Sequence, residues 1–229
     1  MPNIKEIGRN DFWITAYTHL RTAWAGNTFI EAQPAKSGFH LRSGNTVQTD
    51  FLTSETTDYP YARTDDFEAA LLSCWYASIL FVLPAPGTDI AQLEAALAKN
   101  PDMVEPYLVS REGDVRMPIF HFSYETDLGD ALQKLGVHRI FQNTDTLLSM
   151  APSRQGGLLK GVAQKTEITV DKNGIRADSG TISVGAYGGI MGVVQPFHMT
   201  LDRPFVFVIR DPITGALLFV GAVMNPAAN

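Results

Sequence analysis

The residues that could hold a metal ion are scattered along the chain. No histidine has a second histidine, a cysteine or a carboxylate at the spacing of zinc ligands; the five are His19, His40, His121, His138 and His198. The single cysteine, Cys74, neighbours Trp75 in an apolar run and is expected to be a small buried side chain. The sequence therefore predicts no metal site, no disulfide and no cofactor.

Paired carboxylates and a glycine-rich segment offer two further kinds of chemistry. Asp65 with Asp66, and Glu125 with Asp127, could be acid–base pairs, but such residues are far more often exposed turn residues. Glycines at 185, 188, 189 and 192 lack the lysine and the following helix of a phosphate-binding loop. We interpret that segment as a flexible loop.

One serine has neighbours that are typical of a nucleophile. The run Ala177-Asp178-Ser179-Gly180 resembles the Gly-Asp-Ser-Gly-Gly stretch of trypsin-like proteases, but a motif counts only in its structural context. The Ala-Ala-His-Cys segment and the usual cysteines of that family are absent from the sequence. We predict that the chain is not an enzyme, and a trypsin-like enzyme using Ser179 is the minor hypothesis.

Composition and charge narrow the class of protein. A chain of 229 residues with 45% hydrophobic and 18% charged residues can bury a sizeable core. A net charge of -6 without a basic stripe argues against nucleic-acid binding, and no apolar run is long enough to span a membrane. Residues 1–13 contain no apolar leader, so the expected location is cytoplasmic as written, or extracellular if the chain is a fragment of a longer secreted protein.

Local patterns predict mostly strands with two short helices. Alternation and turn residues predict strands over 38–53 (with a turn at 43–45), 67–73 and 75–83. Thr88 or Asp89 can cap a helix whose apolar residues Ile90, Leu93 and Leu97 repeat at helical spacing until Asn100 and Pro101. A second helix is expected over 127–135.

The C-terminal half predicts a long strand, a loop and a closing hairpin. Residues 157–172 alternate as a strand, and a loop rich in glycine and serine runs over 173–194. Strands over 204–210 and 217–223, joined by a Pro–Gly turn at 211–215, predict a β-hairpin buried on both faces. We expect one α+β domain, 1–229, made mostly of antiparallel sheets.

The end of the chain resembles the serpin family of serine protease inhibitors. Residues 199–209, Met-Thr-Leu-Asp-Arg-Pro-Phe-Val-Phe-Val-Ile, are similar to the serpin signature, and residues 218–226 are similar to the family's closing Phe-Met-Gly-x-Val-x-Asn-Pro. Leu20-Arg21-Thr22-Ala23-Trp24 looks like the family's Phe-Lys-Gly-x-Trp. Other matches follow the serpin order from about residue 10 to the end.

The resemblance implies a serpin-like fold without its N-terminal helical part. The implied fold is α+β, with mostly antiparallel β-sheets and a few short helices. A missing covering layer would leave buried strands exposed and invite self-association or a second chain that covers the sheet.

The resemblance also implies a mechanism. In serpins a serine protease cleaves an exposed reactive loop, is held as an acyl-enzyme, and is distorted when the cleaved loop inserts as a new strand into the main sheet. The implied function is inhibition of serine endopeptidases through the loop at 174–196, with a serine protease as partner. Trp24, Ala16 and Gln164 carry over as the sheet-opening region.

The hinge of the loop is expected at Gly174–Gly180. Residues 170–174, Val-Asp-Lys-Asn-Gly, are similar to the family's hinge entry, Val-Asn-Glu-Glu-Gly. In an inserted strand, alternation would place one set of side chains inward, namely Ile175, Ala177, Ser179, Thr181 and Ser183. The other face would carry Arg176, Asp178, Gly180 and Ile182.

Several residues depart from the inhibitory pattern. Ile175 is bulkier than the usual small hydroxyl residue, and Arg176 replaces an acidic one; overpacking the slot can cost about 1 to 3 kcal/mol. Ala16 and Gln164 replace the asparagine and histidine whose hydrogen bond controls opening. The alternative hypothesis is therefore a non-inhibitory relative that serves as a protease substrate or as a binding or structural module.

The family's loop length places the candidate scissile bond near Gly188 and Gly189. Glycine at that bond suits an elastase-like or glycine-tolerant protease, with Tyr187 close by.

Overall fold

The chain folds into two compact units. The computed structural model describes residues 12–20, 22–26, 28–29, 33–142, 159–175 and 195–228. The first unit draws on Met1–His19 and Phe122–Ile168, and the second on Leu20–His121 and Thr169–Asn229. Strands β8 (Phe120–Asp127) and β9 (Leu159–Asp171) pass from one unit into the other. That residues 1–229 form one domain stays a prediction.

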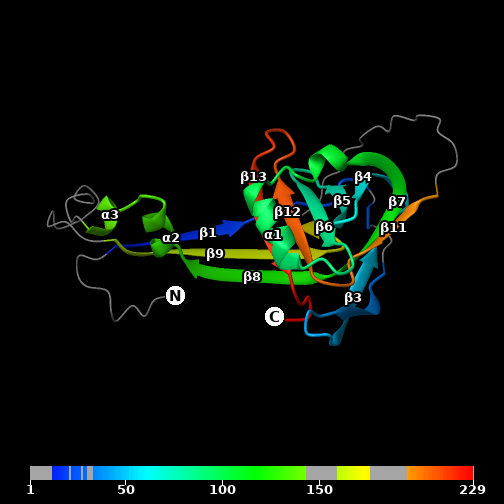
Figure 1. Ribbon diagram of the computed structural model, residues 1–229, viewed down its shortest axis with the longest axis horizontal. Coiled ribbons are helices and arrows are strands. Elements are labelled where there is room, and N and C mark those ends of the chain that lie inside the picture. The colour runs from blue at the N-terminus through cyan, green and yellow to red at the C-terminus, as the bar shows by residue number, and fades with distance from the viewer. Residues whose placement is uncertain are drawn as a thin grey trace. The chain divides into compact units, whose positions relative to one another are not determined.

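The first unit is built on β9. Strand β1 (Phe12–His19) pairs in parallel with residues 159–167 of β9, and β8 also pairs with β9, so the three strands run side by side in Figure 1. Helices α2 (Gly129–Lys134) and α3 (Arg139–Gln142) follow β8. Leu159 and Val162 are buried against apolar side chains from β1, from these helices and from the residue before α2: Phe12, Leu128, Leu132, Ile140 and Phe141.

The second unit contains a nine-stranded sheet. Its order is β13-β12-β6-β5-β4-β7-β3-β2, and β11 pairs with β7. All printed pairings are antiparallel except that of β11 with β7, which is parallel. The strands are β2 (Ala35–His40), β3 (Thr46–Thr53), β4 (Thr57–Arg63), β5 (Phe67–Ser73), β6 (Ser78–Pro84), β7 (Val109–Pro118), β11 (Phe197–Thr200), β12 (Phe205–Arg210) and β13 (Leu217–Val223).

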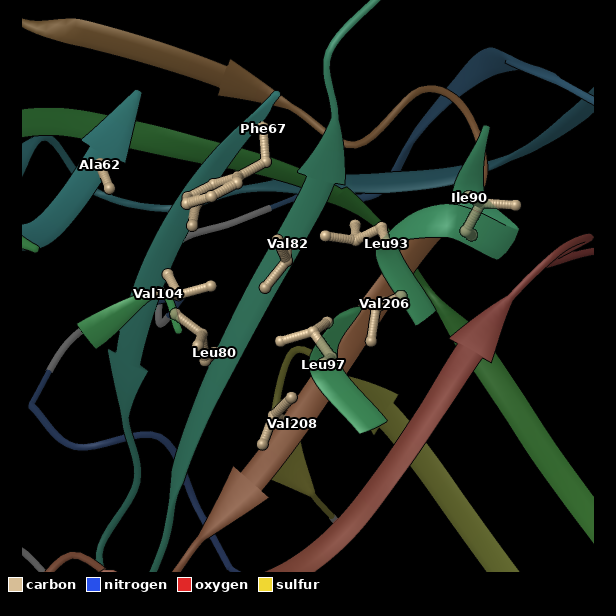
Figure 2. Close-up of a cluster of buried hydrophobic side chains, with 11 residues drawn as sticks. Ala62, Phe67, Leu80, Val82, Ile90, Leu93, Leu97, Val104, Val206 and Val208 are labelled. Atoms are coloured by element: carbon tan, nitrogen blue, oxygen red, sulfur yellow. The ribbon is translucent and has the colours of Figure 1, made fainter. Parts of the chain in front are cut away.

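Helix α1 (Ile90–Lys99) covers one face of this sheet. Its cap is Asp89, whose side chain accepts from the Ala91 N–H, and Asn100 ends it, as predicted. Ile90, Leu93 and Leu97 are buried against side chains of β5, β6 and β12, including Leu80, Val82, Val206 and Val208, as Figure 2 shows. A short 3-10 turn, η2 (Glu105–Tyr107), follows the helix.

The opposite face of β12 packs on aromatic rings. Phe205 contacts the rings of Phe39, Phe81 and Phe120 in edge-on geometry, and Phe207 contacts Phe120. These rings are almost fully buried. Strand β12 is therefore buried on both faces, as the sequence predicted.

The prediction that β13 is buried on both faces is wrong. Leu217, Leu218 and Val220 are 46%, 40% and 51% exposed. The reason is that α1 packs over β5, β6 and β12 but not over β13. Among the described elements nothing else packs on the outer side of β13, which is the end strand of its sheet.

Cys74 is buried, as predicted. Burial raises the pKa of its thiol to about 12, so the thiolate is a negligible species near neutral pH. Its backbone forms an isolated bridge with Trp24. No helix among the described residues has the length and apolarity needed to cross a membrane.

Candidate functional site: the two ends of the loop

A two-residue strand stands at the start of the loop. β10 (Gly174–Ile175) pairs antiparallel with β9, placing Ile175 opposite Val170. On its other side, Ile175 exchanges two backbone hydrogen bonds with Thr22: the Thr22 N–H donates to Ile175 O at 2.5 Å, and the Ile175 N–H donates to Thr22 O at 2.7 Å. β10 therefore lies between β9 and the segment that follows β1.

Gly174 fits this place because it has no side chain. Its φ is +111°, in the region that favours glycine. A Cβ here would lie 2.4 Å from Thr22 O and 2.6 Å from Ala23 Cα, which is closer than real contacts allow. The backbone of residues 22–24 thus closes directly over Gly174.

Ile175 is fully buried, at 0% exposure. Val170 and Thr22, its backbone partners, are buried as well. The site accepts the isoleucine side chain without leaving it in solvent, and alternation then directs the next residue to the opposite face.

Trp24 braces the same segment from behind. Its indole N–H donates to Asp171 O at 2.8 Å, next to the turn between β9 and β10. Its ring lies 5.0 Å from that of Phe29, in a tilted arrangement. The Tyr76 N–H donates to Thr22 Oγ1 at 3.1 Å, so the residues that flank β10 are held by both backbone and side-chain bonds.

Ala16 and Gln164 are register partners on β1 and β9 in the first unit. Ala16 is exposed and has no polar side-chain group, so no side-chain hydrogen bond can join the two. The two strands are held instead by their parallel backbone ladder over Trp13–His19 and Gly161–Glu167. Trp13 also lies over Gly161, where any Cβ would strike the indole ring.

The end of the loop enters a separate aromatic clamp in the second unit. Phe197, the first residue of β11, stacks on Tyr61 with ring centroids 3.9 Å apart and planes inclined by 14°. Gly113 lies beneath it, because a Cβ there would come 2.2 Å from the Phe197 ring. His198 and Asp114 form a close pair at 2.5 Å, on facing register positions of β11 and β7.

Arg111 ties the residue before β11 to this clamp. Its Nη2 donates to Gln195 O at 3.1 Å, and its guanidinium lies over the Tyr61 ring, 5.5 Å from the centroid. Burial and the hydrogen bond to Glu68 raise the pKa of Tyr61, so this phenol stays protonated and donates to Glu68 Oε1. The exit of the loop is thus fixed on β4 and β7.

We expect Arg111→Ala to loosen the exit. The substitution removes a hydrogen bond to Gln195 and the cation over Tyr61, together worth about 1 to 2 kcal/mol at a partly exposed site. Amides of β11 should exchange with deuterium several-fold faster, whereas Arg63→Ala, an exposed neighbouring arginine, should leave them unchanged. Unchanged β11 exchange in Arg111→Ala would contradict the assignment.

The structure places only part of the predicted site. Gly174, Ile175, Trp24, Ala16 and Gln164 are described, and the first three lie together at β10. The remaining predicted residues lie outside the described part of the chain: Arg176, Ala177, Asp178, Ser179, Gly180, Gly188 and Gly189. Within the described ranges, no group of three or more histidine, cysteine or acidic residues could hold a metal ion.

Sequence reasoning missed Thr22 and the whole exit clamp. Thr22 was noted only as part of a motif, and its partner Ile175 is far away along the chain. Arg111 and Gly113 stand in a strongly charged stretch that gave no strand signal. The one available indication was Gly113 itself, since a glycine within a strand often marks close approach of another group.

Comparison with known proteins decides the family. The profile described as "Serpin (serine protease inhibitor)" matches residues 4–226. The chain belongs to the serpin family. Its serpin fold of mostly antiparallel sheets with few short helices agrees with the prediction. Members of this family are generally protease inhibitors rather than catalysts.

Plant serpins are among the similar curated proteins. Serpin-Z4 of Hordeum vulgare is 26% identical over 223 residues, covering 91% of this chain and 54% of that protein. Serpin-Z7 of Hordeum vulgare is 29% identical over 212 residues, covering 88% and 52%. The serpin chain described here thus spans about half the length of the curated relatives it matches.

Solved serpin structures share the fold. A thyroxine-binding globulin in complex with thyroxine is 25% identical, with a TM-score of 0.74, covering 94% of this chain and 57% of that chain. Arabidopsis AtSerpin1 in its native stressed conformation is 21% identical, with a TM-score of 0.67, covering 93% and 56%.

Proposed function

We propose that this serpin inhibits serine endopeptidases by insertion of its cleaved reactive loop. The observation that carries the proposal is β10: the first two residues of the loop are already paired as a strand between Val170 of β9 and Thr22. A strand that has begun in this place can lengthen residue by residue once the rest of the loop is released.

The release would come from cutting the loop. The loop is attached at both ends, through β10 at its start and through β11 and Arg111 at its exit. A segment tied at both ends cannot run along β9 without pulling β11 from β7. Cleavage frees the β10 side while the exit stays on β7.

The chemistry follows ordinary acyl transfer. The protease serine attacks the scissile carbonyl, the amide bond breaks, and the new amine leaves on the fragment that begins before β11. The acyl group on the β10 side remains esterified to the protease serine. Insertion must then outpace hydrolysis of that ester for the protease to be trapped.

Insertion would exchange one ladder for two. β1 and residues 159–167 of β9 are bonded directly to each other. A strand entering between them would be antiparallel to both, so each inserted residue gains pairing that the solvent-exposed loop lacks. The inward set that begins with Ile175 continues with small residues, Ala177, Ser179, Thr181 and Ser183, which suits a close-packed interior.

A protease panel tests the proposal. The chain is mixed with elastase-like, chymotrypsin-like and trypsin-like proteases, the first class being the leading candidate because of Gly188 and Gly189. We expect a complex that survives SDS, with a mass close to the sum of protease and cleaved chain. The same protease with its serine chemically blocked should give none. Complete cleavage within 176–194 without any trapped complex would defeat the proposal.

A second candidate is a non-inhibitory serpin that acts as a protease substrate or a binding module. It is favoured by the bulky Ile175 at the hinge and by the likeness to a thyroxine-binding globulin complexed with thyroxine. Thermal unfolding before and after loop cleavage separates the two. A large rise in Tm on cleavage supports insertion, and an unchanged Tm supports the non-inhibitory candidate.

A further inference from the structure

The apolar surface under α1 continues past the edge of the helix. Register pairing places Val220 beside Val208 and Ala222 beside Val206, so these β13 side chains share the face that α1 covers. Val206 and Val208 are 1% exposed, whereas Val220 is 51% exposed. A groove of about 390 Å³ runs here between α1 and β13, with Leu97 on its helical wall.

Exposed apolar side chains gather at this hairpin. Of the thirteen large hydrophobic residues exposed in the described part of the chain, five lie within 213–224: Ile213, Leu217, Leu218, Val220 and Met224. Scattered exposed apolar residues are ordinary, but a cluster along one strand indicates an interaction surface.

β13 also has a free backbone edge. Among the described strands it pairs only with β12, so its outward N–H and C=O groups face no described strand. Residues 217–223, Leu-Leu-Phe-Val-Gly-Ala-Val, include no charge and no proline, the features that usually protect an edge. By contrast β2, at the opposite end of the sheet, carries Lys36, which pairs with Asp50.

We propose that β13 is the interface of a homodimer, formed by antiparallel pairing of β13 with β13 of a second copy. An antiparallel pair about a two-fold axis matches each outward N–H with a C=O of the other chain. The strand is apolar on both faces, so self-pairing sets Val220 and its neighbours against the same apolar residues and brings no charges together.

The second copy is favoured over other occupants by the chemistry of the strand itself. The edge calls for an extended, uncharged, apolar strand with a free edge of its own, and β13 of another copy meets every one of these requirements. The register irregularity beside Arg210 leaves Phe219–Val223 regular, which is a sufficient length for pairing.

Sedimentation of the full chain tests the dimer. Between about 1 and 100 μM we expect the mass to rise from 25.1 kDa to twice that value and to stop there. Val220→Lys places a charge in the interface and should weaken the dimer at least about tenfold. Ile213→Lys is the matched control, because Ile213 is 92% exposed and lies in the turn outside the strand; it should dimerise like the wild type.

Hydrogen exchange keeps the test independent of folding losses. Amides of Phe219–Val223 should become more protected as the wild-type concentration rises, and stay equally exposed in Val220→Lys, whose α1 amides should remain as protected as in the wild type. A wild-type chain that stays monomeric at 100 μM would overturn the proposal. So would open-ended aggregation, or dimerisation of Val220→Lys at wild-type strength.

Discussion

Replacing Ile175 by aspartate is expected to undock β10 and to abolish the trapped protease complex, with the loop still cut. The Ile175 side chain is 0% exposed, and a carboxylate there would be buried without a cation among its backbone partners Val170 and Thr22. Burial of an unpaired charge costs several kcal/mol, in the uncut chain as well as in any state where β10 is lengthened.

Two measurements separate the hinge from the rest of the fold. The molar ratio of chain to inactivated protease should rise at least about tenfold in Ile175→Asp, and the Ile175 and Thr22 amides should lose their protection from exchange. Ile175→Val is the control, since loss of one methylene costs about 0.5 to 1.5 kcal/mol and keeps the site apolar. An Ile175→Asp chain that traps protease like the wild type would rule out this role for β10.

Trp24→Ala should have the largest effect on stability. The ring is almost fully buried, packs on Phe29 and donates its N–H to Asp171 O. Truncation of a buried tryptophan typically costs about 3 to 5 kcal/mol. Because Trp24 holds the turn into β10, exchange at Gly174 and Ile175 should increase beyond what global unfolding explains.

Trp24→Phe isolates the hydrogen bond. A phenyl ring retains most of the contact with Phe29 but cannot donate to Asp171 O, which should cost about 0.5 to 1.5 kcal/mol. Urea unfolding followed by circular dichroism measures both variants. A Trp24→Ala chain within about 1 kcal/mol of the wild type would contradict the bracing role.

Elements with strong local signals could be predicted from the sequence. Helix α1 begins after its cap Asp89 and ends at Asn100, and β5 occupies residues 67–73, both as expected. These segments carry their own instructions in apolar spacing and in capping residues. Strands β4, β7 and β8 were not predicted, because Pro60 interrupts one and charged or polar residues crowd the other two.

Tertiary contacts explain what the sequence could not show. The pairing of Thr22 with Ile175, and that of Arg111 with Gln195, join residues far apart in the chain, and no periodic pattern announces them. The error at β13 has a similar origin. Apolar residues on both faces predict burial, but which strand lies beyond the edge of a helix depends on the finished sheet.

The buried thiol of Cys74 leaves the chain with a silent background for chemical labelling. With its pKa raised to about 12 and no second cysteine in the sequence, it will not react with maleimides in the folded state. A cysteine introduced at Tyr76, which is exposed beside the Thr22 segment, would then be the sole reactive position. A fluorophore attached there would report movements of the loop entrance in real time, without removal of any native residue of the hinge.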